Sequence, residues 1–162
     1  MSSEADPVRE FLRHTVATVA YRAGKAIRGA PESFAAFRSG ETTRAPAKIL
    51  AHMGDLFDWG LSMARGQTAW HDSGPLSWTA EEQRFFAALK AFDDYLASGE
   101  ALHASPQKLF QGPVADALNH VGQLAMLRRL AGSPVLAENY LIADISVGRV
   151  GADQAQPKSE FE

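Results

Sequence analysis

The chain has 162 residues, of which 46% are hydrophobic and 22% charged, a composition typical of one globular domain. With 16 Lys and Arg against 19 Asp and Glu, the net charge of −3 provides no basic excess for phosphate contacts, so nucleic acid is not an expected partner. The sequence contains no cysteine, which excludes disulfides, thiolate zinc sites, iron–sulfur clusters and cysteine nucleophiles.

Targeting signals are not evident at the level of sequence. No apolar run approaches the roughly 18–20 residues of a membrane span. The N-terminal stretch MSSEADPVRE is acidic and lacks the apolar core of a signal peptide. We therefore expect a cytoplasmic protein without a membrane partner.

Apolar residues recur at helical spacing through most of the chain. Asp6-Pro7 predicts the first helix start, because Asp caps helices and Pro fits their first turn. Thr79-Ala80-Glu81-Glu82 has the pattern of a capping box and predicts another start. The expected elements are a helix over 7–28, a short helical turn around Phe34 and Phe37, a helix within 43–66 that is clearest from Pro46, a loop over 66–78, a helix over 79–98, and a connection over 100–110 with a short helical piece at 107–110.

The last long helix has the clearest boundaries. Gly112-Pro113 predicts its start, and Ala131-Gly132-Ser133-Pro134 predicts its end, because glycine permits the helix to stop and proline cannot continue it. After Pro134 an apolar stretch should pack on the helices, whereas the polar residues 152–162 should fray as a flexible tail. The sequence thus predicts an all-α, up-down-down-up four-helix bundle over residues 1–151, with short additional helical pieces in the connections and the tail.

Two polar residues interrupt the apolar flank of this last helix. Asp116 and His120 are four residues apart and therefore point to the same side of the helix, about one turn from each other. A carboxylate and an imidazole at this spacing can bind one divalent ion, but two ligands are too few. His52 shares a stripe with Ile49 and Leu56 on the second helix and is expected to face the interior.

With these residues the chain resembles the DinB-like superfamily of four-helix bundles. The stretch ILAHMGDLFDW, residues 49–59, resembles its histidine-bearing second helix, and DALNHVGQLAMLRRLAG, residues 116–132, resembles its H-x-G-Q helix. The resemblance implies a divalent metal bound through three residues in a set that is usually all histidine. His52 and His120 match two of those positions, and Asp116 stands at the third. Two histidines and a carboxylate suit zinc, nickel, iron or manganese.

The resemblance does not imply one reaction: some members of the family work as thiol-dependent transferases or isomerases, and many have no known reaction. We expect a metal-dependent S-transferase acting with a low-molecular-weight thiol, or a hydrolase, on a small-molecule substrate that the sequence does not identify. The alternatives are a metal-binding or helical interaction protein without turnover, and a buried His–Asp hydrogen bond without metal. A homodimer is compatible with a bundle of this size.

Several residues outside the three candidate ligands have other expected roles. Gln123 is one turn beyond His120 and is expected either to line the pocket or to bridge helices, whereas Asp55 is interpreted as a solvated residue of the second helix. The remaining residues are expected to serve structure. Trp59 should belong to the core, and Glu138, Asn139 and Tyr140 should dock the C-terminal segment. A solvated face should hold Arg22, Lys25 and Arg28, and no metal is expected at His14, His71 or His103.

Overall fold

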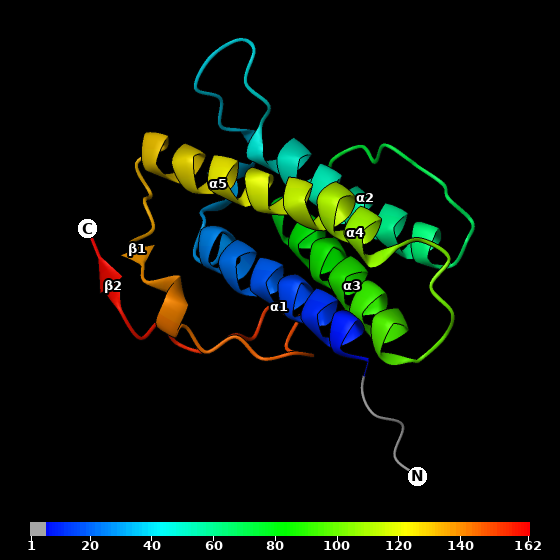
Figure 1. Ribbon diagram of the computed structural model, residues 1–162. Helices are drawn as coiled ribbons and strands as arrows, with labels where there is room; N and C mark the ends of the chain where they lie inside the picture. Colours follow the sequence, from blue (N-terminus) through cyan, green and yellow to red (C-terminus); the bar gives the residue numbers. More distant parts are fainter. Residues whose placement is uncertain (1–5) are drawn as a thin grey trace.

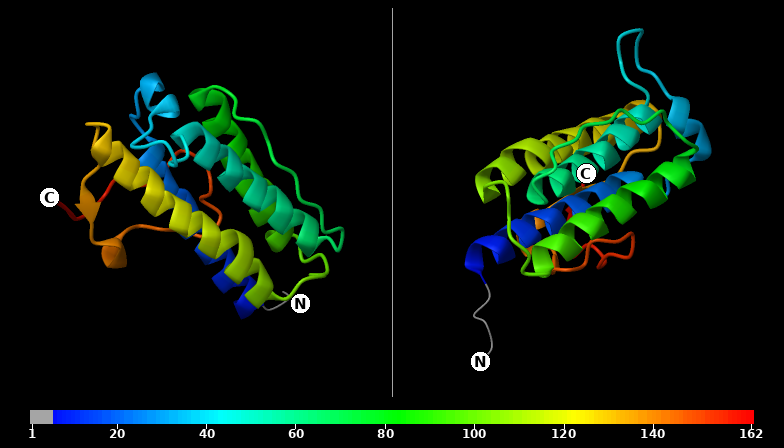
Figure 2. Two further views of the ribbon diagram at one scale, coloured as in Figure 1. Left: turned by 90° about the horizontal axis from the view of Figure 1, so that it is seen from above. Right: turned by 90° about the vertical axis from the view of Figure 1, so that its right-hand side faces the viewer.

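Four long helices lie side by side around a common apolar core in the computed structural model, which describes residues 6–162 (Figures 1 and 2). Helix α1 packs against α3 and α5, and α2 packs against the same two helices. The predicted all-α class is confirmed. The bounds are α1 Pro7–Ile27, α2 Pro46–Ala64, α3 Trp78–Ala97 and α5 Ala115–Leu130.

Short elements fill the connections. A 3₁₀ turn, η1, spans Glu32–Ala36, close to the expected turn around Phe34. One turn of α-helix, α4, spans Pro106–Leu109, and a second 3₁₀ turn, η3, spans Tyr140–Ile142. Two short strands, β1 at Ala137–Glu138 and β2 at Glu160–Phe161, pair in antiparallel register.

The last long helix does not begin at Gly112-Pro113 as predicted. Helix α4 continues directly into a π-helical turn, η2, over Phe110–Val114, and then into α5. Pro113 lies inside this π turn rather than at a helix start. A proline removes one intrahelical N–H bond, and the wider π turn accommodates the missing donor without ending the helix.

Capping of α3 also differs from the prediction. The N-cap is Ser77, whose hydroxyl accepts a hydrogen bond from the Ala80 N–H, so Thr79 already lies inside the helix. The predicted capping box between Thr79 and Glu82 does not form within residues 6–162, and the buried Glu81 carboxylate accepts from the Leu76 N–H. For α1 the prediction is confirmed, because the Asp6 side chain accepts from the Val8 N–H.

The core brings α2 and the η2–α5 segment close together. Aromatic rings from α2 and α3, namely Phe57, Phe85 and Phe92, are fully buried at its centre. Gly60 of α2 faces Pro113, so that a Cβ there would lie 3.1 Å from the proline ring. A larger residue at Gly60 would push η2 away, so this small residue sets how closely α2 approaches the start of α5.

The C-terminal segment packs on the helices, in contrast to the frayed tail expected for residues 152–162. Strand β2 pairs with β1, and the buried Gln154 donates hydrogen bonds to the carbonyls of Arg149 and Gly151. Lys25 of α1 is buried and ion-paired to Glu138 and Glu160, at 2.9 and 2.7 Å. Its assignment to a solvated face was therefore wrong, because acidic residues distant in sequence cover it.

Arg22, expected on the same solvated face, stacks over the Tyr140 ring with its guanidinium carbon 4.0 Å from the ring centre. Residues 1–5, the first half of the N-terminal stretch MSSEADPVRE, lie outside the described residues. Among the helices of residues 6–162, none has both the length and the apolarity needed to cross a membrane.

Candidate metal centre

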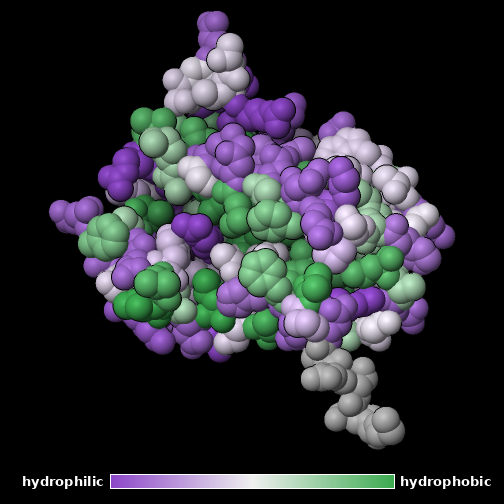
Figure 3. Space-filling model, viewed as in Figure 1, coloured by the Kyte–Doolittle hydropathy of each residue, from purple (hydrophilic) through white to green (hydrophobic). Residues whose placement is uncertain are grey.

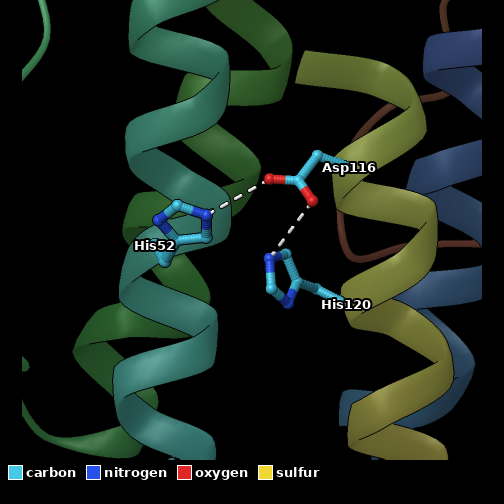
Figure 4. Close-up of side chains that lie close together, drawn as sticks. All are labelled: His52, Asp116 and His120. Carbon is cyan, nitrogen blue, oxygen red and sulfur yellow. Dashed lines mark hydrogen bonds and ion pairs between the residues drawn. The ribbon is translucent and has the colours of Figure 1, made fainter. Parts of the chain in front are cut away.

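The three predicted ligands come together between α2 and α5. His52 projects from α2, and Asp116 and His120 project from successive turns of α5 toward it (Figure 4). His52 Nε2 lies 3.4 Å from one Asp116 carboxylate oxygen, and His120 Nε2 lies 3.5 Å from the other. The two imidazole rings are 4.8 Å apart and nearly perpendicular. One donor atom from each residue falls within 4.8 Å of the others.

The His52–Asp116 contact is a long hydrogen bond, and the three residues are also close enough to hold a common ion. A hydrogen bond to nitrogen usually spans about 2.7–3.2 Å, shorter than either imidazole–carboxylate distance here. Ligands about 2.1 Å from a tetrahedral ion are about 3.4 Å from one another, which follows from the geometry of the tetrahedron. The donor types and their spacing therefore fit a divalent metal.

A hydrogen bond to Gln123 sets the orientation of His120. The Nδ1 atom of the ring lies 2.8 Å from the Gln123 amide oxygen, which can only accept, so this contact favours the tautomer with the proton on Nδ1. In a neutral ring Nε2 then has a free lone pair, and that lone pair points at the Asp116 carboxylate. Two acceptors facing each other at 3.5 Å repel unless a proton or a cation lies between them.

Two tryptophans border the centre on the side of His52. Trp70 lies in the α2–α3 loop and contacts His52 edge to face, with ring centres 5.5 Å apart. Trp59 contacts Trp70 at 5.8 Å and is half-buried rather than part of the core. Trp70 had no signal in the sequence, because a loop residue has no periodicity that reveals what it touches.

On the other side of the centre, His120 lines a groove with a volume of about 710 Å³. The groove lies between α5 and the segment that leads into α2. Gln123 also lines it, so this residue both bridges to His120 and borders the groove, while Asn119 and Gly122 complete the wall at this end. The candidate centre is therefore accessible from an open space large enough for a small molecule.

A second carboxylate–imidazole group lies between α2 and the α2–α3 loop. His71, predicted to have no metal-type partners, lies 3.1 Å from Asp55 and 3.2 Å from Asp58. Arg84 of α3 also approaches Asp55 at 3.1 Å and Asp58 at 3.6 Å. The guanidinium already supplies positive charge at these carboxylates, so a divalent cation would be repelled.

Asp55 is buried, so its interpretation as a solvated residue was wrong. Its two oxygens accept from the backbone and the hydroxyl of Ser73 at 2.8 and 2.7 Å, which fastens the α2–α3 loop to α2. The remaining histidines are not near the candidate centre: His14 is exposed on α1, and His103 packs against Gly66. Glu138 binds Tyr21 and Lys25, consistent with the expected docking role.

Comparison of the chain with known protein families, with curated proteins and with solved structures finds no match. The DinB-like resemblance therefore stays a prediction, carried by the two sequence motifs and by the geometry that follows from them.

Proposed function

We propose that this protein is a divalent-metal-dependent enzyme of the DinB-like kind, with the metal bound by His52, Asp116 and His120. The observation that carries the proposal is the Asp116–His120 pair, in which a carboxylate oxygen lies 3.5 Å from Nε2 while Nδ1 faces the Gln123 amide oxygen. A cation between them removes the repulsion and uses both groups as ligands. His52 supplies the third donor from the facing helix.

The course of the chain supports the same assignment. In Figure 1, α1 and α5 run from right to left and α2 and α3 run from left to right. This order agrees with the up-down-down-up bundle that the resemblance implies. The loop over residues 65–77 allows α2 and α3 to run in the same direction, because two neighbouring helices with the same direction need a long connection between them.

Three protein donors leave coordination positions for water or a substrate, as in catalytic rather than structural metal sites. A bound divalent ion supplies Lewis-acid chemistry there, since coordination lowers the pKa of a thiol or a water molecule and so provides a nucleophile at neutral pH. Gln123 holds the proton of His120 on Nδ1, and Trp70 shields the His52 ring from water. The groove beside His120 admits the electrophile. A thiol S-transferase fits this arrangement best, and a hydrolase uses the same groups.

Metal analysis of the purified protein tests the centre. We expect one divalent ion per chain in the wild type, loss of the ion in His120→Ala, and no loss in His14→Ala, which removes an exposed histidine far from the centre. Asp116→His creates the three-histidine set of the family and should retain the ion. A wild-type protein without metal, or metal that persists in His120→Ala, would contradict the proposal.

Turnover separates an enzyme from a metal-binding protein without catalysis. The metal-loaded protein is offered low-molecular-weight thiols with a model electrophile, and separately a panel of ester and amide substrates. Acceleration by the wild type that disappears in His120→Ala supports an enzyme. Metal binding with no acceleration of either reaction supports the non-catalytic alternative. The homodimer stays a prediction, to be checked by analytical ultracentrifugation.

A further inference from the structure

The groove beside His120 has a distinct polarity along its length. Helices α2 and α5 run in opposite directions, so residues before His52 in α2 lie beside residues after His120 in α5 (Figure 1). His120 and Asn119 line one end. Ile49, Met126 and Leu127 line the middle, and Leu130 and the segment before α2 line the far end. A molecule lying in the groove would therefore meet polar, then apolar, then again polar surroundings.

Arg44 is the only charged residue that lines the groove within residues 6–162. It is exposed and has no carboxylate within ion-pairing distance in this part of the chain. Ser39 lies on the same segment and offers a hydroxyl group, whereas the Thr43 hydroxyl already donates to the Gly40 carbonyl. A guanidinium without a partner binds a carboxylate through charge-assisted and often bidentate hydrogen bonds.

The apolar part of the wall is unusually exposed. Met126 and Leu130 are 59% and 56% exposed, although both lie on the face of α5 that borders the groove. Large apolar side chains gathered along a groove gain from an apolar occupant that removes them from water. Apolar residues also gather on another part of the surface, at the lower left of Figure 3, over the segment that holds η3.

We propose that the groove binds an amphipathic carboxylate, with the carboxylate on Arg44, the apolar chain on Met126, Leu127 and Ile49, and the reacting end beside His120. The length of the groove suits a small molecule, since the six residue steps from Pro46 to His52 rise by about 9 Å along α2. This substrate class rests on the proposed function only for the reaction at the His120 end. Binding of the carboxylate and of the chain depends on the groove alone.

Calorimetric titration with octanoate tests the proposal. Octanoate should bind the wild type, whereas octanol, which lacks the charge, and acetate, which lacks the chain, should each bind at least tenfold more weakly. Arg44→Gln should weaken octanoate binding about tenfold or more, because it removes the charge-assisted bonds. Arg129→Gln is the matched control: it removes the same charge from an exposed position of α5 that does not line the groove, and should leave binding unchanged.

A second variant tests the apolar wall. Met126→Asp places a negative charge in the groove and should abolish octanoate binding. Because Met126 is exposed, the variant should unfold at the wild-type temperature, and a thermal unfolding measurement checks that the fold is intact. Any of three results would overturn the proposal: the wild type does not bind octanoate, Arg44→Gln binds it as tightly as the wild type, or octanol binds as tightly as octanoate.

The metal-centre proposal and the groove proposal can be contradicted independently of each other. The titration is run on the protein as purified, on chelator-treated protein and on His120→Ala. Octanoate binding by the wild type, together with the absence of metal from that protein as purified, would contradict the proposed function and leave the groove proposal intact. A bound metal without octanoate binding would overturn the groove proposal and leave the metal centre intact.

Discussion

Gln123 connects the groove to the candidate metal centre through a single hydrogen bond, 2.8 Å long, to His120 Nδ1. From the sequence, its place one turn after His120 indicated a contact with that residue or a bridge between helices. The choice could not be made from spacing, because it depends on the rotamers of both side chains. The contact fixes the protonated nitrogen of His120, and metal affinity depends strongly on such partners.

At the residue scale we predict that Gln123→Leu lowers metal affinity about 10- to 100-fold, because Nδ1 loses its acceptor and the ring is free to turn. Competition with a chromophoric chelator measures the affinity. Asn119→Leu is the control, since Asn119 also lines the groove and is exposed but has no hydrogen bond to His120 within residues 6–162. Gln123→Glu keeps an acceptor and should retain the affinity. Equal metal affinities in Gln123→Leu and the wild type would show that Gln123 does not orient His120 for metal binding.

At the scale of elements, the long helices were predictable and their junctions were not. The apolar periodicity and the Asp6-Pro7 start located the helices to within a few residues. Gly112-Pro113 has the composition of a helix start, yet α4, η2 and α5 form one continuous helical segment. The difference is tertiary in origin, because η2 is packed against α2 through Gly60 and that packing compensates for the missing proline donor.

The α2–α3 loop shows the same limit for the candidate site. Trp70 and His71 follow no pattern in the sequence, but the loop is fastened to α2 where Ser73 donates twice to Asp55. This attachment holds Trp70 against His52. A buried aspartate on a helix face is recognisable only once its positive partner is known, and here that partner, Arg84, comes from another helix.

We predict that Asp55→Asn lowers the free energy of unfolding by about 3 kcal/mol, because it removes a buried charge from Arg84 and one acceptor from Ser73. Urea denaturation measures this loss, and hydrogen exchange should show faster exchange over residues 69–73. Asp94→Asn is the control, because Asp94 pairs with Lys90 on the exposed face of α3 and should cost no more than about 0.5 kcal/mol. Similar losses in both variants would show that the loop is not held by Asp55.

At the scale of the whole molecule, the C-terminal segment is joined to α1 by a polar cluster in which Tyr21, Lys25 and Glu138 are buried and Glu160 is exposed. The helices of the predicted fold account for none of these contacts. Glu160 belongs to a polar segment that resembles a free tail, and its partner Lys25 lies at the opposite end of the chain. Local composition carries no information about such a pairing, so the sequence could indicate the helices but not what covers them.

The cluster changes the protonation of both α1 residues. Burial raises the pKa of Tyr21, and its hydrogen bond to Glu138 raises it further. Burial alone would lower the pKa of Lys25, but the hydrogen bonds and negative charges of Glu160 and Glu138 outweigh it, and the net pKa is raised. Both groups therefore hold their protons more tightly in the folded state than in the unfolded state.

From the sign of these shifts we predict a loss of stability at alkaline pH. The contribution is fully present below the unfolded pKa values of about 10, and is lost as the pH rises from there through the folded values. Tyr21→Phe removes one of the two groups, so its unfolding free energy should fall less steeply than that of the wild type between pH 9 and about 11. Urea denaturation at each pH measures the slope.

Tyr95→Phe provides the comparison, because Tyr95 donates to the Ala101 carbonyl at an exposed position and contacts no carboxylate of the cluster. Its stability should follow the wild-type pH profile. If Tyr21→Phe followed that profile as well, the phenol would not be coupled to the docking of the C-terminal segment. A flatter profile for Tyr21→Phe alone, with faster hydrogen exchange of β1 and β2 in the wild type at high pH, would show that deprotonation of this cluster releases the segment from α1.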